Sequence, residues 1–322
     1  MIVWGVSALR TVAGILPWKV GVALGGGLGA VAFVSLPSAR RRAAAHLVMA
    51  FPSCVKDADR GRIARRSFAN LGRSLFELLM LSCRPHTPIE RLCAVEGEEC
   101  LKAALANGRG VIFLTGHLGN WELMAALVTR RGYPASVVAT PLYDYRLDRL
   151  VIDVRAAQGV HTISRGSRSS AKHLLSCLRR NAILGMLIDQ DTDVEGVFVP
   201  FFGRSAHTPA GAAVLALKTG AAVVFGFILR EGAYRHRLII RGPVELIRTG
   251  DHARDVYENT ALFTQEIERS IRAYPEHWVW MHNRWKRRPP SPEAGAEGRP
   301  ARERISDIEA VAAPTRAGGA GA

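Results

Sequence analysis

A histidine and a carboxylate, His117 and Glu122, stand five positions apart in the segment Thr115-Gly116-His117-Leu118-Gly119-Asn120-Trp121-Glu122. Such a pair can form a general base with its orienting acid: the imidazole accepts a proton from a hydroxyl, and the carboxylate fixes the tautomer and stabilises the imidazolium. On one continuous α-helix, five residues would rotate the two side chains about 140° apart. They can meet only if the chain turns between them, which Gly116 and Gly119 permit. We therefore expect His117 and Glu122 to be the catalytic pair.

The elements around this segment alternate between short β-rich runs and helical patterns. The expected strands are residues 110–115, 136–140, 161–164, 183–188, 222–229 and 235–241, and the expected helices 121–131, 144–158, 169–180, 209–219 and 256–271. This alternation is typical of an α/β fold with a central, mostly parallel sheet flanked by helices. Ligands of open α/β sheets bind at the carboxyl ends of the strands. His117, which directly follows the first expected strand, lies at such an end.

Three common catalytic signatures are absent from the sequence: the G-x-S-x-G elbow, the H-E-x-x-H helix and the G-x-x-x-x-G-K-[ST] loop. Their absence weakens the cases for a serine hydrolase, a zinc hydrolase and an NTPase. The five cysteines are scattered, with no CxxC pair and no metal-type spacing to histidine. We expect no metal and no cofactor. The hydroxyl that His117 activates must then be exogenous or lie elsewhere in the chain.

The N-terminal region 1–42 indicates a membrane anchor. Residues 11–36 are almost all apolar or small, interrupted by Pro17 and Lys19, and an arginine cluster at 40–42 follows. The length approaches the ~20 residues that cross a bilayer. Two alternatives stay open, a spanning helix and a helix lying in the interface. If the segment spans, the arginine cluster places the rest of the chain on the cytoplasmic side.

Three glycines in this region, Gly21, Gly25 and Gly29, recur at four-residue spacing, which predicts a face for close helix packing. The region 43–288 is expected to form the α/β domain, opening with helices that break near Phe51-Pro52. The Pro-, Ala-, Gly- and Glu-rich region 289–322 is expected to be a disordered tail.

The formal net charge of +15 favours an anionic partner, which could be nucleic acid, an acidic membrane face or an acidic soluble ligand. No helix-turn-helix or zinc-finger signature supports nucleic acid, so we expect an anionic membrane surface and no nucleic acid. Two other hypotheses stay open: a membrane-anchored hydrolase in which His117 activates water, and a non-catalytic basic protein that binds nucleic acid or acidic lipid.

Four segments resemble one known family. The stretch 116–122 is similar to the H-x4-D/E motif of the glycerolipid and lysophospholipid acyltransferases, and its Gly-His-…-Gly-Asn-Trp-Glu form resembles the branch of lipid A biosynthesis lauroyl/myristoyl (late) acyltransferases. Residues 189–203 are similar to its D-Q-D…V-F-V-P-F-F-G segment, and residues 274–286 to its P-E-x-W-x-W-x-H-x-R-W-K close. Residues 43–52 follow its early helical pattern more loosely. The resemblance spans roughly residues 5–288.

The resemblance implies a glycerolipid-acyltransferase-like fold and an O-acyltransferase of the bacterial inner membrane, with its catalytic domain on the cytoplasmic side. The donor would be an acyl thioester on acyl carrier protein or coenzyme A. The acceptor would be a glycolipid hydroxyl, with a lipid A precursor expected first and a phosphatidylinositol mannoside or ornithine lipid as alternatives. One departure concerns the acceptor: Asn283 stands where the lauroyltransferase close often has an arginine.

Further site residues are expected near the strand ends. Arg165, which follows the strand 161–164, and backbone amides at the start of helix 121–131 are candidate donors to an oxyanion. Asp189 and Asp191 are candidates for polar positioning of substrate and not for a metal, because the family is not known to require one. The alternative for both is a solvated loop that ends the strand.

Two aromatic groups complete the expected site. Phe198, Phe201 and Phe202 are candidates for an acyl-chain groove, and plain core is their alternative. The other group is a membrane-interface belt near anionic headgroups, for which a packed terminal helix with a basic edge is the alternative. Its members are Trp278, Trp280, Trp285, Arg284 and Lys286.

Overall fold

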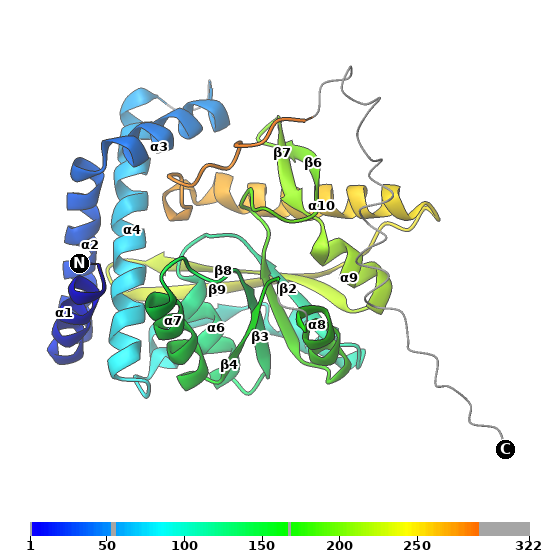
Figure 1. Cartoon of the computed structure of the whole chain (residues 1–322), viewed down its shortest axis with the longest axis horizontal. Helices are drawn as coiled ribbons and strands as arrows, with labels where there is room; N and C mark the ends of the chain where they lie inside the picture. Colours follow the sequence, from blue (N-terminus) through cyan, green and yellow to red (C-terminus); the bar gives the residue numbers. More distant parts are fainter. Residues whose placement is uncertain (1, 53–55, 167–168, 290–322) are drawn as a thin grey trace.

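A computed structural model describes residues 2–52, 56–166 and 169–289 and is built on a seven-stranded sheet (Figure 1). The strand order is β1-β9-β8-β2-β5-β3-β4, with every neighbouring pair parallel except β8 and β9. The strands are β1 (Cys93–Glu96), β2 (Val111–Thr115), β3 (Ala135–Ala139), β4 (Val160–Ser164), β5 (Ile183–Leu187), β8 (Ala222–Glu231) and β9 (Arg235–Val244). The predicted α/β fold with a mostly parallel sheet is confirmed.

The register of the central strands positions the site. β2 is buried at all five positions and pairs with β5 from Val111↔Ile183 to Thr115↔Leu187. The two strands therefore end at the same level. Residues that follow β2 and β5 by two positions, His117 and Asp189, come to lie beside each other at the carboxyl edge of the sheet.

Helices cover both faces of this sheet, as predicted. One face packs against α5 (Glu98–Ala106), α6 (Trp121–Arg130) and α7 (Tyr145–Ala157), and the other against α8 (Ser170–Arg179), α9 (Gly211–Thr219) and α10 (His252–Ala273). Alternate residues of one strand point to opposite faces. In β5, Leu184 and Met186 accordingly belong to the core on the α8–α10 side, whereas Ile183 belongs to the core on the α5–α7 side.

Four helices precede the sheet: α1 (Ile2–Ile15), α2 (Trp18–Ser35), α3 (Pro37–Ala50) and α4 (Asp57–Cys83). The expected single apolar segment is thus two helices, because Pro17 lacks the amide hydrogen that would continue α1. Within the described residues, α2 is the one helix long and apolar enough to cross a membrane by length and composition. Of the residues of α2, 28% are buried inside the molecule.

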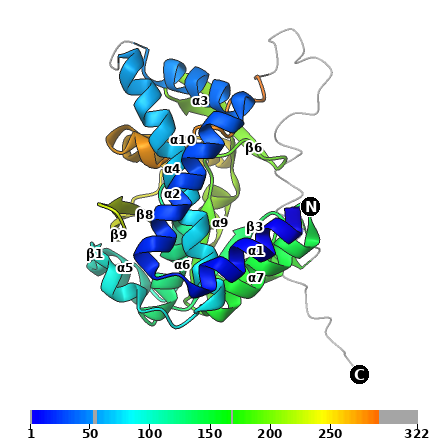
Figure 2. The same cartoon turned by 90° about the vertical axis from the view of Figure 1, so that its left-hand side faces the viewer.

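The predicted glycine face is confirmed, because α2 lies along α4 through it (Figure 2). A Cβ atom at Gly25 would stand 2.7 Å from the Gly72 carbonyl oxygen, and one at Gly29 would stand 2.3 Å from the Phe68 carbonyl oxygen. Only glycine allows the two backbones to approach this closely.

Three elements were not expected from the sequence. They are β1, α5 and a separate antiparallel hairpin of β6 (Gly196–Phe201) and β7 (Arg204–Pro209). The hairpin turns at Phe202 and Gly203, both with positive φ, as two-residue hairpin loops require. The break between α3 and α4 lies where it was predicted. The expected disordered tail lies outside the described residues, apart from Pro289.

Candidate active site

The carboxylate of Asp189 forms hydrogen bonds with two atoms of His117. Its backbone amide donates to Asp189 Oδ2 at 2.7 Å, and its ring Nδ1 lies 2.8 Å from Asp189 Oδ1. The Trp278 indole Nε1 also donates to Asp189 Oδ2, at 2.7 Å. An ionised carboxylate only accepts hydrogen bonds, so Nδ1 carries the hydrogen and the neutral ring presents Nε2 as an acceptor. This is the tautomer that a general base needs.

The Asp189 carboxylate is built to stay ionised. It is 2% exposed, and burial by itself would raise its pKa. The neighbouring His117, with the hydrogen bonds from the ring, the backbone amide and Trp278, outweighs burial and lowers the pKa of Asp189 to about 2. The ring of His117 therefore lies against a buried negative charge.

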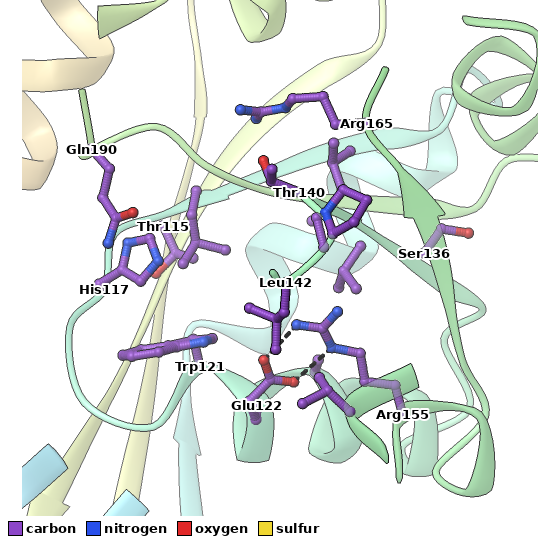
Figure 3. A pocket seen from close by; sticks show the side chains of 18 of the residues that line it. Thr115, His117, Trp121, Glu122, Ser136, Thr140, Leu142, Arg155, Arg165 and Gln190 are labelled. Atoms are coloured by element: carbon purple, nitrogen blue, oxygen red, sulfur yellow. Dashed lines mark hydrogen bonds and ion pairs between the residues drawn. The ribbon is translucent and has the colours of Figure 1, made fainter. Parts of the chain in front are cut away.

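Glu122 does not orient His117, which corrects the expected pairing. Both its oxygens accept from Arg155 of α7, Oε2 from Nε at 2.8 Å and Oε1 from Nη2 at 2.6 Å. The chain does turn at Gly119, but Glu122 lies on the first turn of α6 and faces Arg155 (Figure 3). Asp189 instead follows the end of β5, the strand next to β2, by two residues. The ion pair is mostly shielded, and the Glu122 anion outweighs burial to raise the pKa of Arg155.

A cavity of about 840 Å³ is lined both by His117, the ring bound to Asp189, and by the Glu122–Arg155 ion pair (Figure 3). His117, Gln190 and Thr140 line its polar side near the strand ends, and the Glu122–Arg155 pair forms part of its wall. The remainder is mostly apolar. It is formed by Phe113, Val137, Ile183, Gly185 and Leu187 on the sheet and by Met124, Ala125 and Val128 on α6.

The cavity follows the strands away from His117. The lining positions of β5 are its first, third and fifth residues, which share one face of the sheet. At a rise of ~3.3 Å per residue these positions cover about 13 Å of apolar wall. The site thus combines an imidazole with a fixed tautomer and an apolar chamber behind it, an arrangement that suits a reacting group attached to a hydrocarbon chain.

Two glycines allow the catalytic loop to fit. A Cβ at Gly116 would stand 2.9 Å from Asp189 Oδ2, and Gly119 has a φ of +72° that non-glycine residues avoid. A Cβ at Gly119 would also stand 1.6 Å from the Ile228 carbonyl oxygen. The amide of Gly119 donates to the His277 carbonyl at 2.9 Å, so the loop is fixed to the segment that also supplies Trp278.

A second buried carboxylate, Glu77 of α4, holds the other end of the loop. It accepts from Asn120 Nδ2 at 2.7 Å and from both terminal nitrogens of Arg230 at 2.8 and 2.7 Å. Burial would raise the pKa of Glu77, but the neighbouring His236 and Arg230 lower it to about 2. Asn120 Oδ1 meanwhile accepts from the Leu123 amide and caps α6. Sequence reasoning missed Glu77 and Arg230 because they are distant in the chain from the motif.

The other polar residues expected in the site lie in different places. Arg165 lines the cavity, where its Nη1 donates to Thr192 Oγ1 at 3.2 Å, and burial lowers its pKa. Asp191 is not among the lining residues. It accepts from the Arg287 amide at 2.8 Å and pairs with Arg287 Nε at 3.1 Å. Its place in the fold corrects the expected substrate contact, because its carboxylate is used to hold the C-terminal segment.

The expected acyl groove of three phenylalanines is wrong. Phe201 is 0% exposed and packs against Trp278 and Trp285, and Phe202 packs against Phe51. Phe198 packs at the edge of His207. The hairpin β6–β7 folds against α10, so Phe201 and Phe202 belong to the core on the α8–α10 face, whereas Phe198 is only half-buried. None of the three rings lines the cavity.

The expected membrane belt is also mostly wrong. Trp278, Trp280 and Arg284 are buried, at 1%, 0% and 0% exposure. Arg284 donates to the His207 carbonyl and to Thr208 Oγ1, and burial lowers its pKa to about 10. Trp285 is half-buried against the ring of His46. Lys286 is exposed, and for Lys286 a membrane contact stays a prediction.

The comparisons with known proteins agree with this geometry. The family described as bacterial lipid A biosynthesis acyltransferase matches residues 1–287. A phosphatidylinositol mannoside acyltransferase of Mycobacterium tuberculosis (strain CDC 1551 / Oshkosh) is 29% identical over 223 residues, which is 68% of this chain and 69% of the relative. Two relatives from Escherichia coli (strain K12) cover more of the chain. The lipid A biosynthesis palmitoleoyltransferase is 28% identical over 279 residues (85% and 87% of the two chains), and the lipid A biosynthesis lauroyltransferase is 27% identical over 277 residues (85% and 88%).

The family match extends over far more than half of the chain, and the histidine of the expected motif, His117, lines a mostly apolar cavity. The chain therefore belongs to the bacterial lipid A biosynthesis acyltransferase family, and it is an acyltransferase.

Proposed function

We propose that this acyltransferase moves a fatty acyl group from an acyl thioester to a hydroxyl of a glycolipid, with His117 as the general base. The observation that carries the proposal is the His117 ring at the mouth of the cavity, with Nδ1 bound to the buried Asp189 carboxylate. A base needs this fixed tautomer, and a fatty acyl chain needs an apolar chamber next to the reacting carbon.

The chemistry balances without a covalent enzyme intermediate. His117 Nε2 accepts the proton of the acceptor hydroxyl while the oxygen forms a bond to the thioester carbonyl carbon. The carbonyl electrons move to its oxygen. When the carbonyl re-forms, the C–S bond breaks, and the departing thiolate takes the proton from His117 Nε2. Asp189 stays ionised throughout, which stabilises the imidazolium that exists between the two proton transfers.

The oxyanion formed on the carbonyl oxygen requires a cationic or N–H donor. Arg165 is our side-chain candidate, because it lines the cavity and its guanidinium is directed toward the side where Gln190 and His117 lie (Figure 3). Arg155 is less suited, because its Nε and Nη2 already donate to the Glu122 carboxylate. We assign the Glu122–Arg155 pair to shaping the mouth of the cavity and orienting the acceptor.

The finer identity of the substrates is part of the proposal. A lipid A precursor is the first acceptor to test, because two of the relatives named above are lipid A biosynthesis enzymes, and a phosphatidylinositol mannoside is the second, because another relative acts on it by name. Acyl carrier protein and coenzyme A are the two candidate donors. We place the enzyme at the bacterial inner membrane with its catalytic domain on the cytoplasmic side, supported by the apolar helix α2.

Transfer of a radiolabelled acyl group tests this proposal. Purified protein receives acyl thioesters of acyl carrier protein or coenzyme A and one acceptor at a time: lipid A precursor, phosphatidylinositol mannoside or ornithine lipid. We expect label in a glycolipid, and we expect His117→Ala to lower the rate about 10²–10⁴-fold. His161→Ala, which removes an exposed histidine on β4, is the matched control and should leave the rate unchanged.

Two outcomes would contradict the proposal. Thioester loss at an equal rate with and without acceptor would identify a hydrolase in which His117 activates water. Full transfer by His117→Ala would exclude His117 as the base. Label in a phosphatidylinositol mannoside alone would keep the mechanism and remove lipid A as the acceptor.

A further inference from the structure

A second hollow, of about 530 Å³, lies outside the active site between α2, α4 and the β8–β9 turn. Four arginines contribute to its lining, three from α4 and one from β8: Arg65, Arg66, Arg73 and Arg230. Arg66 and Arg73 lie seven positions apart, which places them on one face of α4 two turns from each other. The α2 side of the hollow offers only small residues: Gly26, Gly27 and Ala30.

The positive charge of this hollow is poorly compensated. Arg230 is paired with Glu77, whose carboxylate also accepts from Asn120. Arg73 Nη1 donates to the neutral Asn70 at 2.9 Å. Among the described residues, no carboxylate lies within ion-pair distance of Arg65, Arg66 or Arg73, and Glu276 is the one acid in the lining. A site with this excess of guanidinium groups favours a phosphate or another compact anion.

The small residues of α2 keep the hollow open. A Cβ at Gly26 would stand 2.8 Å from Arg73 Nε, so a larger side chain would displace the guanidinium. A Cβ at Gly27 would have no heavy atom within 4 Å, so this position faces open space. An anion can therefore reach Arg73 along the surface of α2.

An apolar stripe on α2 borders the hollow. Its side chains are exposed, from 38% at Leu24 to 67% at Val34, and the stripe comprises Val20, Leu24, Leu28, Val31 and Val34. Val31 follows Ala30 by one position and so points about 100° away from it around the helix. When the stripe faces hydrocarbon, the arginines lie beside the helix at the level of lipid headgroups. Lys19, whose ammonium lies 4.6 Å from the centre of the Tyr234 ring, extends the same basic flank.

The arrangement of α2 and α4 disfavours a helix that crosses the membrane upright. Gly25 and Gly29 hold the middle of α2 directly against α4. An upright α2 would carry Arg66 and Arg73 of α4 to the depth of the hydrocarbon core, where arginine cations are costly. An α2 lying in the plane of the interface buries the stripe and leaves the arginines in the headgroup layer.

We propose that α2 lies flat in the membrane interface and that the arginine hollow binds the phosphate of an anionic phospholipid, whose acyl chains run along the exposed stripe. The proposal rests on the membrane association included in the proposed function. It identifies a lipid site that is separate from the cavity of His117 and that serves to seat the enzyme on its membrane.

Vesicle binding of the full chain tests the site. We compare vesicles of phosphatidylcholine alone with vesicles that contain phosphatidylglycerol, using the triple variant Arg65→Gln, Arg66→Gln, Arg73→Gln. Arg230 is left unchanged because it supports Glu77. The matched control removes three positive charges from α8, on the other side of the molecule in Figure 1: Lys172→Gln, Arg179→Gln, Arg180→Gln.

We expect the hollow variant to lose affinity for the phosphatidylglycerol vesicles by on the order of 100-fold and the α8 variant to lose much less. Equal losses would overturn the site, because bulk charge would then explain binding. Inorganic phosphate that stabilises the wild type but not the hollow variant, with unchanged vesicle binding, would overturn it in favour of a soluble anion. Loss of acyl carrier protein binding with unchanged vesicle binding would overturn it in favour of a protein partner.

The orientation of α2 has its own measurement. Fluorophores placed by Val20→Cys, Leu28→Cys and Val34→Cys report depth through quenching by lipids brominated on their chains. A flat helix predicts equal quenching at the three positions, and deeper quenching at Leu28 than at both ends would overturn it. Acyl transfer in detergent micelles should be unchanged in the hollow variant. If the proposed function is wrong, the wild type itself will transfer no acyl group in micelles. If only the lipid site is wrong, the wild type will still transfer it.

Discussion

The two faces of the central sheet are built for different purposes. On the α6–α7 face, the lining residues include Gly185, Ala125 and Val137, and they leave a cavity of about 840 Å³. On the α8–α10 face, Phe201, Trp278 and other aromatic rings are buried in the core together with aliphatic side chains. The chamber therefore arises where side chains are small, and the aromatic residues that look suited to hold an acyl chain instead make the opposite face rigid.

The aromatic core on the α8–α10 face also supports the site on the α6–α7 face. Trp278, part of the aromatic core, donates to the same Asp189 oxygen that accepts from the His117 amide. The aromatic core on one side of the sheet thus helps to fix the carboxylate that binds His117. A site built in this way can keep its geometry while the cavity changes its occupant.

The largest effect is expected from a substitution at Asp189, and not at any other carboxylate near the site. Asp189→Asn replaces an obligate acceptor with an amide, whose NH₂ group can face Nδ1 and favour the wrong tautomer. We expect the transfer rate at saturating substrate to fall about 10²–10⁴-fold with little change in the Michaelis constant. Asp191→Asn is the matched control, two residues away and outside the cavity. A comparable rate loss in that control would show that the whole loop, and not the His117 tautomer, had been disturbed.

Acid stability should also depend on Asp189. Its pKa is lowered to about 2 in the folded state, below the ~3.9 of an unfolded aspartate, so the carboxylate stabilises the fold above the higher value and loses this contribution as pH falls through the lower one. Urea unfolding between pH 5 and 2 should show wild type losing on the order of 2 kcal/mol more than Asp189→Asn. Parallel pH profiles for the two proteins would contradict the assignment.

The sequence predicted the helices and strands well, but it did not predict which of them lie side by side in the fold. Six strands and five helices were expected close to where they lie, because apolar periodicity and glycine turns are local signals. The partner of His117 depended on sheet order. β5 lies next to β2 although five other elements separate them in the chain, so Asp189 was recognised as a site residue without its role. Glu122 was chosen instead because it is near in sequence.

The aromatic residues show a second limit. Burial of Phe201, Trp278 and Arg284 depends on a hairpin that folds onto α10, and this is a tertiary contact with no local signal. Residue type alone cannot distinguish a ring in a groove from a ring in a core. The cavity could not be predicted at all, because it is defined by what Gly185 and Ala125 do not fill.

Cavity size gives a direct test of the contrast between the faces. Ala125→Leu adds three carbons to the α6 wall and should shift donor preference toward shorter acyl chains, by about 10-fold in the ratio of rates for short and long donors. Phe201→Leu on the filled face should lower stability by about 1 kcal/mol without changing that ratio. Competition between two labelled donors measures the ratio, and chemical unfolding measures the stability. An altered chain preference in the Phe201 variant would mean that the aromatic face contacts the acyl chain after all.

The smallest expected effect comes from the bond that joins the two faces. Trp278→Phe keeps an aromatic ring in the core but removes the indole N–H that donates to Asp189 Oδ2. With one donor fewer, the Asp189 carboxylate is held less firmly and its pKa rises toward the usual aspartate range. The transfer rate should fall several-fold at neutral pH, and in urea unfolding the pH profile of stability should move to higher pH, because the carboxylate protonates earlier. Trp280→Phe is the control, since the Trp280 indole donates to the Pro275 carbonyl and not to Asp189. Stability would fall in both variants, so only a shifted pH profile confined to Trp278→Phe identifies the bond as one that positions the catalytic carboxylate.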